Sequence, residues 1–394
     1  MMNWRMPRRV ACFVILAVTF SALCLAAQEA PRLELTAKSA VLMDYASGEV
    51  LFAKDAHKPL PPASVTKIMT LALALEALQD GRVQLDTMVT TSQHAARMGG
   101  TQIWLEPNEQ MSYKDLLYAI AVGSANDAAV AVAEHLAGSS SAFVDVMNAK
   151  ARSLGMKNTS FSNPNGLPPS EYGVPEPHVS SAYDLALLSR WAWKLPLFKD
   201  LASTWGPVVM RENTSRQPEL WTFNKMMKQY PGMDGIKTGM TNEAGFCLAA
   251  TAERNNVRLI AVALGAPTSV ERNNDIAKLF DYGFSQLHAV KLAAAGEKIG
   301  EITIQNGKEN KVAVAPVQDV VVSSRRDQKL EPKTQIIPGA TKAPIKKGQS
   351  VGQLVVFLGE KEVLRVNLVA LSNVEKASHL QMMLRTMQKA VKGK

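Results

Sequence analysis

The segment from about Ser64 to Gln79 is predicted to form a helix without a polar face. Its central residues, 68–78, read IMTLALALEAL, so apolar side chains lie on nearly all sides of the helix axis. Such a helix needs a core around it, and a chain of 394 residues is long enough to build a large core and two domains. We therefore expect this helix to be buried and to end before Gly81.

The predicted strands come from both ends of one region. Apolar and polar residues alternate over 39–54 around a turn at Ser47 and Gly48, a pattern typical of a hairpin. Three more strands are expected at 236–239, 247–252 and 259–264. Other helices are expected at 113–121, 127–136, 180–193 and 275–287. The pattern predicts an α+β domain over 31–288, with a helical cluster and an antiparallel sheet that unites its two ends.

The composition changes near Ala293, where short apolar runs separated by polar turns begin. Strands are expected at 299–304, 311–314, 317–322, 336–337, 352–358 and 363–369. Strands of this length and spacing predict a small all-β module, a sandwich, over 293–370.

The last segment, 373–394, changes period again and is predicted to form an amphipathic helix. Its apolar side chains follow three- and four-residue spacing at Val374, Ala377, Leu380, Leu384, Met387 and Val391. Its basic side chains flank that stripe at Lys376, Arg385, Lys389 and Lys392. We expect the helix to lie on an anionic membrane surface. The stripe lacks Trp and Phe, so the alternatives are a helix packed on the protein or on a partner, or a frayed tail.

The first residues are typical of a secretory signal peptide over 1–27. Three arginines within the first nine residues precede an apolar run over 11–23, and small residues follow at Ala26 and Ala27. We therefore expect an exported protein, in the periplasm or at the outer face of the cytoplasmic membrane, with an uncleaved anchor as the alternative. Of three cysteines, only Cys247 would remain, in an apolar stretch that favours a small buried side chain over a nucleophile.

The formal charge of +9 is concentrated at the two ends of the chain. The signal segment carries three arginines and no acid, and residues 374–394 carry five basic side chains against one acid. The region between them is nearly neutral, which argues against a nucleic-acid partner. The sequence contains no metal-ligand cluster and no phosphate-binding loop, so we expect no cofactor and no metal.

Three short motifs follow one another, and each occurs once: S-x-x-K at Ser64–Lys67, S-x-N at Ser124–Asn126 and K-T-G at Lys237–Gly239. In the first, the two side chains lie one helical turn apart and share a face. A serine hydroxyl is a weak nucleophile that needs a base. A lysine amine can act as that base if burial or a neighbouring cation lowers its pKa. Backbone N–H groups at the helix start could stabilise an oxyanion.

The other two motifs supply the remaining groups for acyl transfer. Ser124 can pass a proton between an amine and a leaving group, and the carboxamide of Asn126 can bind a substrate amide. Lys237 and Thr238 suit a carboxylate, and Gly239 lets a ligand approach the backbone. Taken alone, each motif is better explained by a helix cap or a strand-to-turn transition. Their joint occurrence predicts chemistry through a serine ester.

At these motifs and around them, the chain resembles low-molecular-mass penicillin-binding proteins of the D-alanyl-D-alanine carboxypeptidase type. The likeness extends over about 40–369, and its specific segments are 63–70, 124–128, 163–167, 181–186, 234–239, 282–284 and 343–349. The last of these resembles the C-terminal β domain of that family. The resemblance implies the penicillin-recognising serine transferase fold, a β-lactamase/transpeptidase-like catalytic domain, over the first region.

The resemblance also implies roles in the attack on a peptidoglycan stem peptide. Ser64 would attack the carbonyl of the penultimate D-alanine, with Lys67 as the base. Ser124 would relay the proton to the departing D-alanine. Backbone N–H groups of Ser64 and Met240 would form the oxyanion hole. Water would then hydrolyse the ester, and β-lactam antibiotics would acylate the same serine.

Further residues are implied to bind the substrate. Lys237, Thr238 and Arg272 would hold the terminal carboxylate, although a solvated arginine at a helix start is the alternative for Arg272. In two places the chain departs from the family pattern: Ala125 stands where glycine is frequent, and Asn165 stands where histidine is frequent. Either departure could alter the rate or the choice of substrate. We expect a histidine elsewhere in the chain, His178, to be structural.

Three other functions remain open. A β-lactamase shares the motifs but needs a deacylating carboxylate, and neither Glu171 nor Glu176 has a suitable context. The added β module also argues against it. An endopeptidase or transpeptidase differs only in leaving group or acceptor, so the motifs do not exclude it. A noncatalytic wall-binding or β-lactam-sensing protein would have no need of the Ser64–Lys67 pair.

Overall fold

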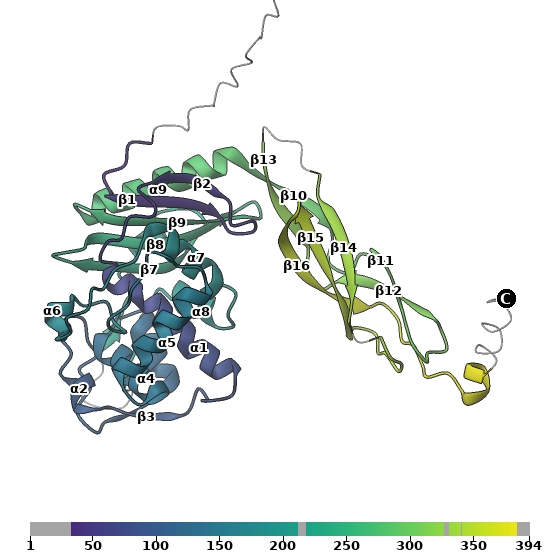
Figure 1. Cartoon of the computed structure of the whole chain (residues 1–394), viewed down its shortest axis with the longest axis horizontal. Coiled ribbons are helices and arrows are strands. Elements are labelled where there is room, and N and C mark those ends of the chain that lie inside the picture. Colours follow the sequence, from purple (N-terminus) through teal and green to yellow (C-terminus); the bar gives the residue numbers. More distant parts are fainter. Residues whose placement is uncertain (1–32, 212–217, 327–330, 340, 384–394) are drawn as a thin grey trace, which may run out of the picture. The chain divides into compact units, whose positions relative to one another are not determined.

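The computed structural model describes residues 33–211, 218–326, 331–339 and 341–383 (Figure 1). The predicted signal peptide (1–27) and the end of the predicted C-terminal helix (384–394) lie outside the described residues. None of the described helices combines the length and apolarity that a membrane span requires.

One antiparallel sheet forms the centre of the first region, in the order β2-β1-β9-β8-β7. Its strands are β1 (Ser39–Asp44), β2 (Val50–Lys54), β7 (Met233–Thr241), β8 (Gly245–Arg254) and β9 (Val257–Ala266). Ser39 pairs with Leu264, so strands from the two ends of the domain are direct neighbours. The predicted hairpin and the predicted union of the two ends are both confirmed.

Helices cover both faces of this sheet. Helix α9 lies on one face, and the other α-helices lie on the opposite face (Figure 1). The longer helices are α1 (Lys67–Gln79), α3 (Tyr113–Ala121), α4 (Asn126–Ala137), α5 (Ser140–Ser153), α7 (Ala182–Ala192) and α9 (Ser269–Gln286). The shorter elements are η1 (Ala63–Thr66), η2 (Lys225–Lys228), α2 (Gln93–Ala96), α6 (Pro169–Tyr172), α8 (Phe198–Ser203), β3 (Met88–Thr90), β4 (Gln110–Ser112), β5 (Val208–Val209) and β6 (Glu219–Leu220).

Helix α1 is the centre of the helical layer, as its sequence predicts. It contacts α3, α4 and α7, and every residue from Lys67 to Leu75 is buried. Several surrounding helices start at a serine or threonine whose side chain accepts a backbone N–H of the first turn, which satisfies one of the free donors there. These caps are Ser112 for α3, Ser139 for α5, Ser181 for α7 and Thr268 for α9.

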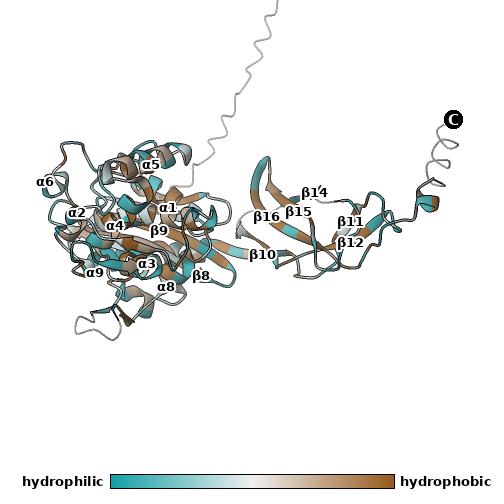
Figure 2. Ribbon diagram, turned by 90° about the horizontal axis from the view of Figure 1, so that it is seen from below, coloured by the Kyte–Doolittle hydropathy of each residue, from teal (hydrophilic) through white to brown (hydrophobic). Residues whose placement is uncertain are grey.

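The second region is the all-β module that the sequence predicts. A two-stranded sheet joins β10 (Leu287–Ala293) to β13 (Val320–Arg325). A five-stranded sheet has the order β11-β12-β16-β15-β14. Its strands are β11 (Gly300–Thr303), β12 (Lys311–Pro316), β14 (Lys333–Pro338), β15 (Ser350–Leu358) and β16 (Lys361–Ala370). Side chains of both sheets share one core, and hydrophobic and hydrophilic residues alternate along the strands (Figure 2).

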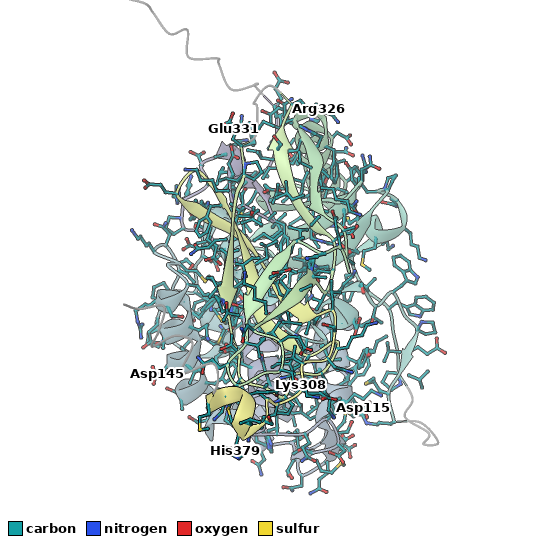
Figure 3. The ribbon with its side chains drawn as sticks, turned by 90° about the vertical axis from the view of Figure 1, so that its right-hand side faces the viewer. Asp115, Asp145, Lys308, Arg326, Glu331 and His379 are labelled. Carbon is teal, nitrogen blue, oxygen red and sulfur yellow. The ribbon has the colours of Figure 1, made fainter. Side chains whose placement is uncertain are left out.

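The predicted start of the C-terminal helix, at 373, is wrong. Val374 forms a β-bridge with Ile345, and Lys376 forms one with Gly307. Val374 and Ala377 are buried, with 1% and 4% of their surface exposed. The described helical turn begins only at His379 (Figure 3). Two residues assigned to the apolar stripe, Val374 and Ala377, thus belong to the β module, because packing against it buries them more than an isolated helix would.

Candidate active site

The three motifs converge on one pocket of about 500 Å³. Its lining includes Ser64 from the first motif, Ser124 and Asn126 from the second, and Thr238 and Gly239 from the third. Lys67 and Lys237 lie beneath this surface, with 0% and 4% of their area exposed. Residues predicted to act together from distant parts of the sequence are therefore brought together.

Two glycines fix the backbone that carries Ser64. A Cβ on Gly239 would lie 3.0 Å from the Ser64 nitrogen and 2.9 Å from the Pro62 oxygen. A Cβ on Gly166 would lie 2.0 Å from the Ala63 oxygen, and Gly166 also has φ +87°. Real Cβ atoms do not approach other atoms so closely. The backbone of η1 therefore packs against Gly239 of β7 and against Gly166 of the 163–167 loop at distances that only glycine allows.

Lys67 has three oxygen neighbours within the described part of the chain. Its Nζ lies 2.6 Å from Asn126 Oδ1, 2.6 Å from the main-chain oxygen of Asn165 and 3.0 Å from Ser64 Oγ. The first two atoms can only accept hydrogen bonds, whereas the serine hydroxyl can also donate. A neutral amine fits this arrangement, with two N–H groups directed to the acceptors and its lone pair to Ser64.

The surroundings of Lys67 favour that neutral form. Burial lowers the pKa of Lys67 well below its ordinary value, and the positive charge of Lys237 lowers it further. The charge of Asp127 acts in the opposite direction. An amine poised in this way next to a hydroxyl has the property that a general base requires.

Ser124 lies between α3 and α4 in a left-handed conformation with φ +56°, which is uncommon for a residue with a side chain. Its hydroxyl accepts a hydrogen bond from Lys237 Nζ at 2.9 Å. Its main-chain oxygen accepts one from Thr101 Oγ1 at 2.7 Å. Burial lowers the pKa of Lys237 to about 7. The second hydroxyl is thus held at a lysine that can exist in either protonation state near neutral pH.

Asn126 joins the motifs to the edge of the pocket. Its Oδ1 accepts from Lys67, and its Nδ2 donates to the Gly99 oxygen at 2.7 Å. Its main-chain N–H donates to the Thr101 oxygen at 2.7 Å. The carboxamide therefore orients Lys67 and fixes the loop that carries Gly100 and Thr101, both of which line the pocket.

Two of the three residues predicted to hold a carboxylate line the pocket, and the third, Lys237, lies beneath its surface. Thr238 and Arg272 both line it. Arg272 is 5% exposed, and its guanidinium donates to the neutral carboxamide oxygen of Asn273 from Nε at 3.1 Å and from Nη2 at 2.8 Å. Burial lowers the pKa of Arg272, yet an arginine stays protonated in proteins. Met240 also lines the pocket, at the end of the K-T-G strand.

His178 has the contacts of a structural residue, as the sequence predicts. Its Nδ1 accepts the main-chain N–H of Ser162 at 3.0 Å, so its proton resides on Nε2, which lies 2.7 Å from Thr66 Oγ1. Burial lowers the pKa of His178 to about 3. The ring is therefore neutral and connects the 160–163 segment to the turn that carries Ser64.

The structure also bears on three other expectations from the sequence. The side chain of Asn165 is fully buried, and its Oδ1 accepts the N–H of Leu167, so this position reaches Lys67 through its main chain. Cys247 is 0% exposed, and burial raises its pKa to about 11, which fits a small buried side chain. Glu171 and Glu176 are exposed and do not line the pocket.

Some pocket residues were missed from the sequence. Phe223 and Lys225 line the pocket although no motif includes them. Asp127, directly after the S-x-N motif, is buried and accepts backbone N–H groups of Ile103 and Leu105. A charged residue beside a motif at a helix start was the available signal for Asp127. Phe223 and Lys225 carry no such signal.

Comparison with known families identifies this arrangement. The model of the peptidase family described as D-alanyl-D-alanine carboxypeptidase matches residues 25–268, and the model described as penicillin-binding protein 5, C-terminal domain, matches residues 288–376. The chain belongs to the D-alanyl-D-alanine carboxypeptidase family. The first match covers all three motifs, and the second covers the β module.

Relatives of this carboxypeptidase family align over nearly the whole chain. D-alanyl-D-alanine carboxypeptidase DacF of Bacillus subtilis (strain 168) is 39% identical over 95% of this chain and 95% of its own. The structure of penicillin-binding protein 5 from Haemophilus influenzae has a TM-score of 0.63 and 32% identity, over 88% of this chain and 99% of its own. The structure of ampicillin-bound penicillin-binding protein D2 from Listeria monocytogenes has a TM-score of 0.57 and 33% identity, over 64% of this chain and 99% of its own.

Proposed function

We propose that this serine-type D-alanyl-D-alanine carboxypeptidase removes the terminal D-alanine of peptidoglycan stem peptides through an acyl-enzyme on Ser64. The observation that carries the proposal is the set of three oxygens around Lys67 Nζ, which leaves the lone pair of a neutral amine for the Ser64 hydroxyl. A noncatalytic binder would not need this arrangement.

The first half of the reaction transfers the acyl group to the enzyme. As Ser64 Oγ bonds to the carbonyl carbon of the penultimate D-alanine, its proton passes to Lys67 Nζ. The oxygen that becomes negative is held by the backbone N–H groups of Ser64 and Met240. When the C–N bond breaks, the Ser124 hydroxyl gives its proton to the leaving nitrogen and receives one from the neighbouring lysines.

The substrate is oriented by its terminal carboxylate. Thr238 and Arg272 line the pocket and supply a hydroxyl and a cation, and the buried Lys237 supplies a second cation beneath them. The carboxamide of Asn126 and the backbone of Gly239 bind the peptide next to the bond that breaks. When D-alanine leaves, the part of the pocket that held its carboxylate becomes free. A water molecule then hydrolyses the ester.

β-Lactams would acylate the same serine, because their ring amide and carboxylate reproduce the two groups that the pocket recognises. A serine held between Gly166 and Gly239, with its base already in contact, is ready for either acyl donor. The solved relative with bound ampicillin supports this part of the proposal.

The test is the intact-protein mass after exposure to benzylpenicillin, with free D-alanine assayed from a diacetyl-Lys-D-Ala-D-Ala peptide in parallel. A persistent adduct on the wild type and none on Ser64→Ala, together with release of D-alanine, is expected. A folded sample with no adduct and no release would contradict the proposal. Rapid penicillin turnover without peptide cleavage would assign the protein to the β-lactamases instead.

We further propose that the protein is exported and that its C-terminal segment lies on the membrane surface. Basic residues of the 374–394 segment and the exposed Leu380 and Met383 support this role. Two truncated chains test it, one that ends at Ser378 and one that ends at Asn373. The longer one keeps the buried Val374 and Ala377 in the β module, and the shorter one loses them.

The chain that ends at Ser378 should lose its binding to vesicles of anionic lipid and keep its melting temperature. The chain that ends at Asn373 should also melt at a lower temperature, because it lacks two core residues. Undiminished vesicle binding by the chain that ends at Ser378 would contradict the membrane role.

A further inference from the structure

Phe223 and Lys225 line the pocket, and the mechanism above uses neither. They come from the segment that precedes β7, in and directly before η2. Phe223 is 53% exposed, and Lys225 is exposed as well. An aromatic ring and an ammonium group are therefore open to whatever the pocket binds.

The backbone that carries this pair is held by buried neighbours. Asn224 and Met226, which alternate with the pair, are 2% and 3% exposed. The main-chain oxygen of Met226 accepts the N–H of Tyr230 at 2.8 Å. η2 also contacts β7, the strand that carries the K-T-G motif. Phe223 and Lys225 are thus presented to the pocket by a well-packed segment.

The charged side chains of the pocket do not compensate one another. Among the described residues that line it, Lys225 and Arg272 are cations and none is an acid. In the proposed reaction, Arg272 and the buried Lys237 share the terminal carboxylate of the substrate. No ion pair within the described residues involves Lys225. A cleft lined by one sign of charge attracts ligands of the opposite sign, so a second negative group on the substrate would suit Lys225.

The chemistry of the stem peptide limits where that second charge can be. Both residues of D-Ala–D-Ala have only a methyl group as side chain, and the one free carboxylate of the pair is the terminal one. The first side chain that can carry a further charge belongs to the residue before them. Phe223, next to Lys225 on the same segment, offers apolar surface for the aliphatic part of such a side chain.

We propose that Phe223 and Lys225 select the side chain of the residue that precedes D-Ala–D-Ala in the stem peptide. The ring packs against a long aliphatic chain, and the ammonium group pairs with a carboxylate at its end. The pocket thus favours stem peptides with a second negative charge over neutral ones. This inference rests on the proposed function, because it names the substrate class of the same site.

The test compares two peptides that differ by one carboxylate. Diacetyl-diaminopimelyl-D-Ala-D-Ala carries a carboxylate at the side-chain carbon where diacetyl-Lys-D-Ala-D-Ala carries a hydrogen. In low salt, kcat/KM for release of D-alanine should be about fivefold higher for the acidic peptide, and salt should reduce this ratio. Equal values for the two peptides would overturn the inference. No release from either peptide would instead contradict the proposed function.

Charge variants of Lys225 assign the preference to this residue. In Lys225→Gln the ratio of the two kcat/KM values should fall from about five to about one, and in Lys225→Glu it should fall below one. A ratio that stays at about five while both values drop would overturn the inference, since Lys225 would then serve the terminal carboxylate that both peptides share.

Lys228→Gln is the matched control. Lys228 is an exposed lysine of the same short helix, but its ammonium group lies 5.4 Å from the ring centroid of Trp205, and it is not among the residues that line the pocket. The ratio should stay at about five in this variant. A fall equal to that in Lys225→Gln would show a general effect of charge and overturn the role of Lys225.

Phe223→Ala tests the apolar half of the proposal. Both peptides have the aliphatic chain, so kcat/KM should fall by a similar factor for each, and their ratio should change little. Unchanged values for both peptides would contradict the role of the ring.

Discussion

The three oxygens around Lys67 suit a neutral amine, with two N–H groups and one lone pair, and the burial of the side chain favours that form over an ammonium group. The two shorter contacts, both 2.6 Å, go to Asn126 Oδ1 and the Asn165 oxygen, which can only accept. The longer contact, 3.0 Å, goes to the Ser64 hydroxyl, which can donate. At the scale of the residue, the base is thus held by its acceptors as well as by its burial.

Replacing Lys67 by arginine should abolish this function. A guanidinium remains protonated at any working pH, so Lys67→Arg should acylate with benzylpenicillin at least about 100-fold more slowly than the wild type. Raising the pH should not restore the rate. Lys150→Arg, at an ion pair with Glu76, is the matched control and should acylate normally. Recovery of Lys67→Arg at high pH would refute the role of Lys67 as base.

His178 should make the stability of the fold depend on pH. Its pKa is lowered from 6.5 to about 3, so between these values the unfolded chain binds a proton that the native chain does not. Stability is therefore lost as the pH falls below 6.5, by up to about 1.4 kcal/mol per pH unit.

Urea unfolding at pH 7 and pH 5 tests this expectation. The wild type should lose about 2 kcal/mol more than His178→Gln between the two pH values. The exposed His57→Gln serves as the control and should behave as the wild type does. Equal losses in the wild type and His178→Gln would refute the assignment of a neutral buried histidine.

At the scale of elements, the sequence predicts the parts that carry a strong local pattern. The hairpin of β1 and β2 follows from alternation, the buried α1 follows from an apolar sequence without a polar face, and strands were also expected within β7, β8 and β9. Helix α5 was missed because it buries only one narrow stripe, Ser140, Phe143, Met147 and Ala151. The pairs β3–β4 and β5–β6 have two or three residues per strand, too few for any period to show.

The same limit applies to the site. The motifs predict which side chains take part, because their chemistry is carried by residue type. The contact from Lys67 to Asn165 uses a main-chain oxygen, so the identity of residue 165 does not reveal it. Phe223 and Lys225 reach the pocket only through tertiary packing.

The 163–167 loop should be intolerant of any side chain at Gly166. In Gly166→Ala, the new Cβ would lie 2.0 Å from the Ala63 oxygen, and the loop or η1 would have to move. Acylation by benzylpenicillin should fall by at least about tenfold, because displacement of the nucleophile is costly to the rate.

Gly173→Ala is the matched control for this element. Gly173 has φ +85°, close to the +87° of Gly166, but no atom of the described residues lies within 4 Å of its Cβ position. The Gly173→Ala variant should have a lower melting temperature, because of backbone strain alone, and should acylate at the rate of the wild type. If both variants acylate equally well, the contact between the loop and η1 does not position Ser64.

At the scale of the whole molecule, the residues that line the pocket all lie between Ser64 and Asn273. The fragment 33–290 should therefore acylate with benzylpenicillin at the rate of the full chain, as measured by intact-protein mass. The structure from Listeria monocytogenes aligns over 99% of its own length with only 64% of this chain. A folded fragment that does not acylate would show that the β module contributes to the chemistry.

The order of strands in the central sheet also governs how this chain can fold. β1 pairs with β2 at once, but its other neighbour, β9, ends at Ala266. During synthesis, which starts at the N-terminus, the apolar segment of α1 is made long before β9. It therefore stays exposed until the sheet that covers it can close. Contacts so distant in sequence make closure slow and leave the unfinished chain prone to aggregation. The apolar surface of α1 therefore stays uncovered until the segment between β1 and β9 is complete.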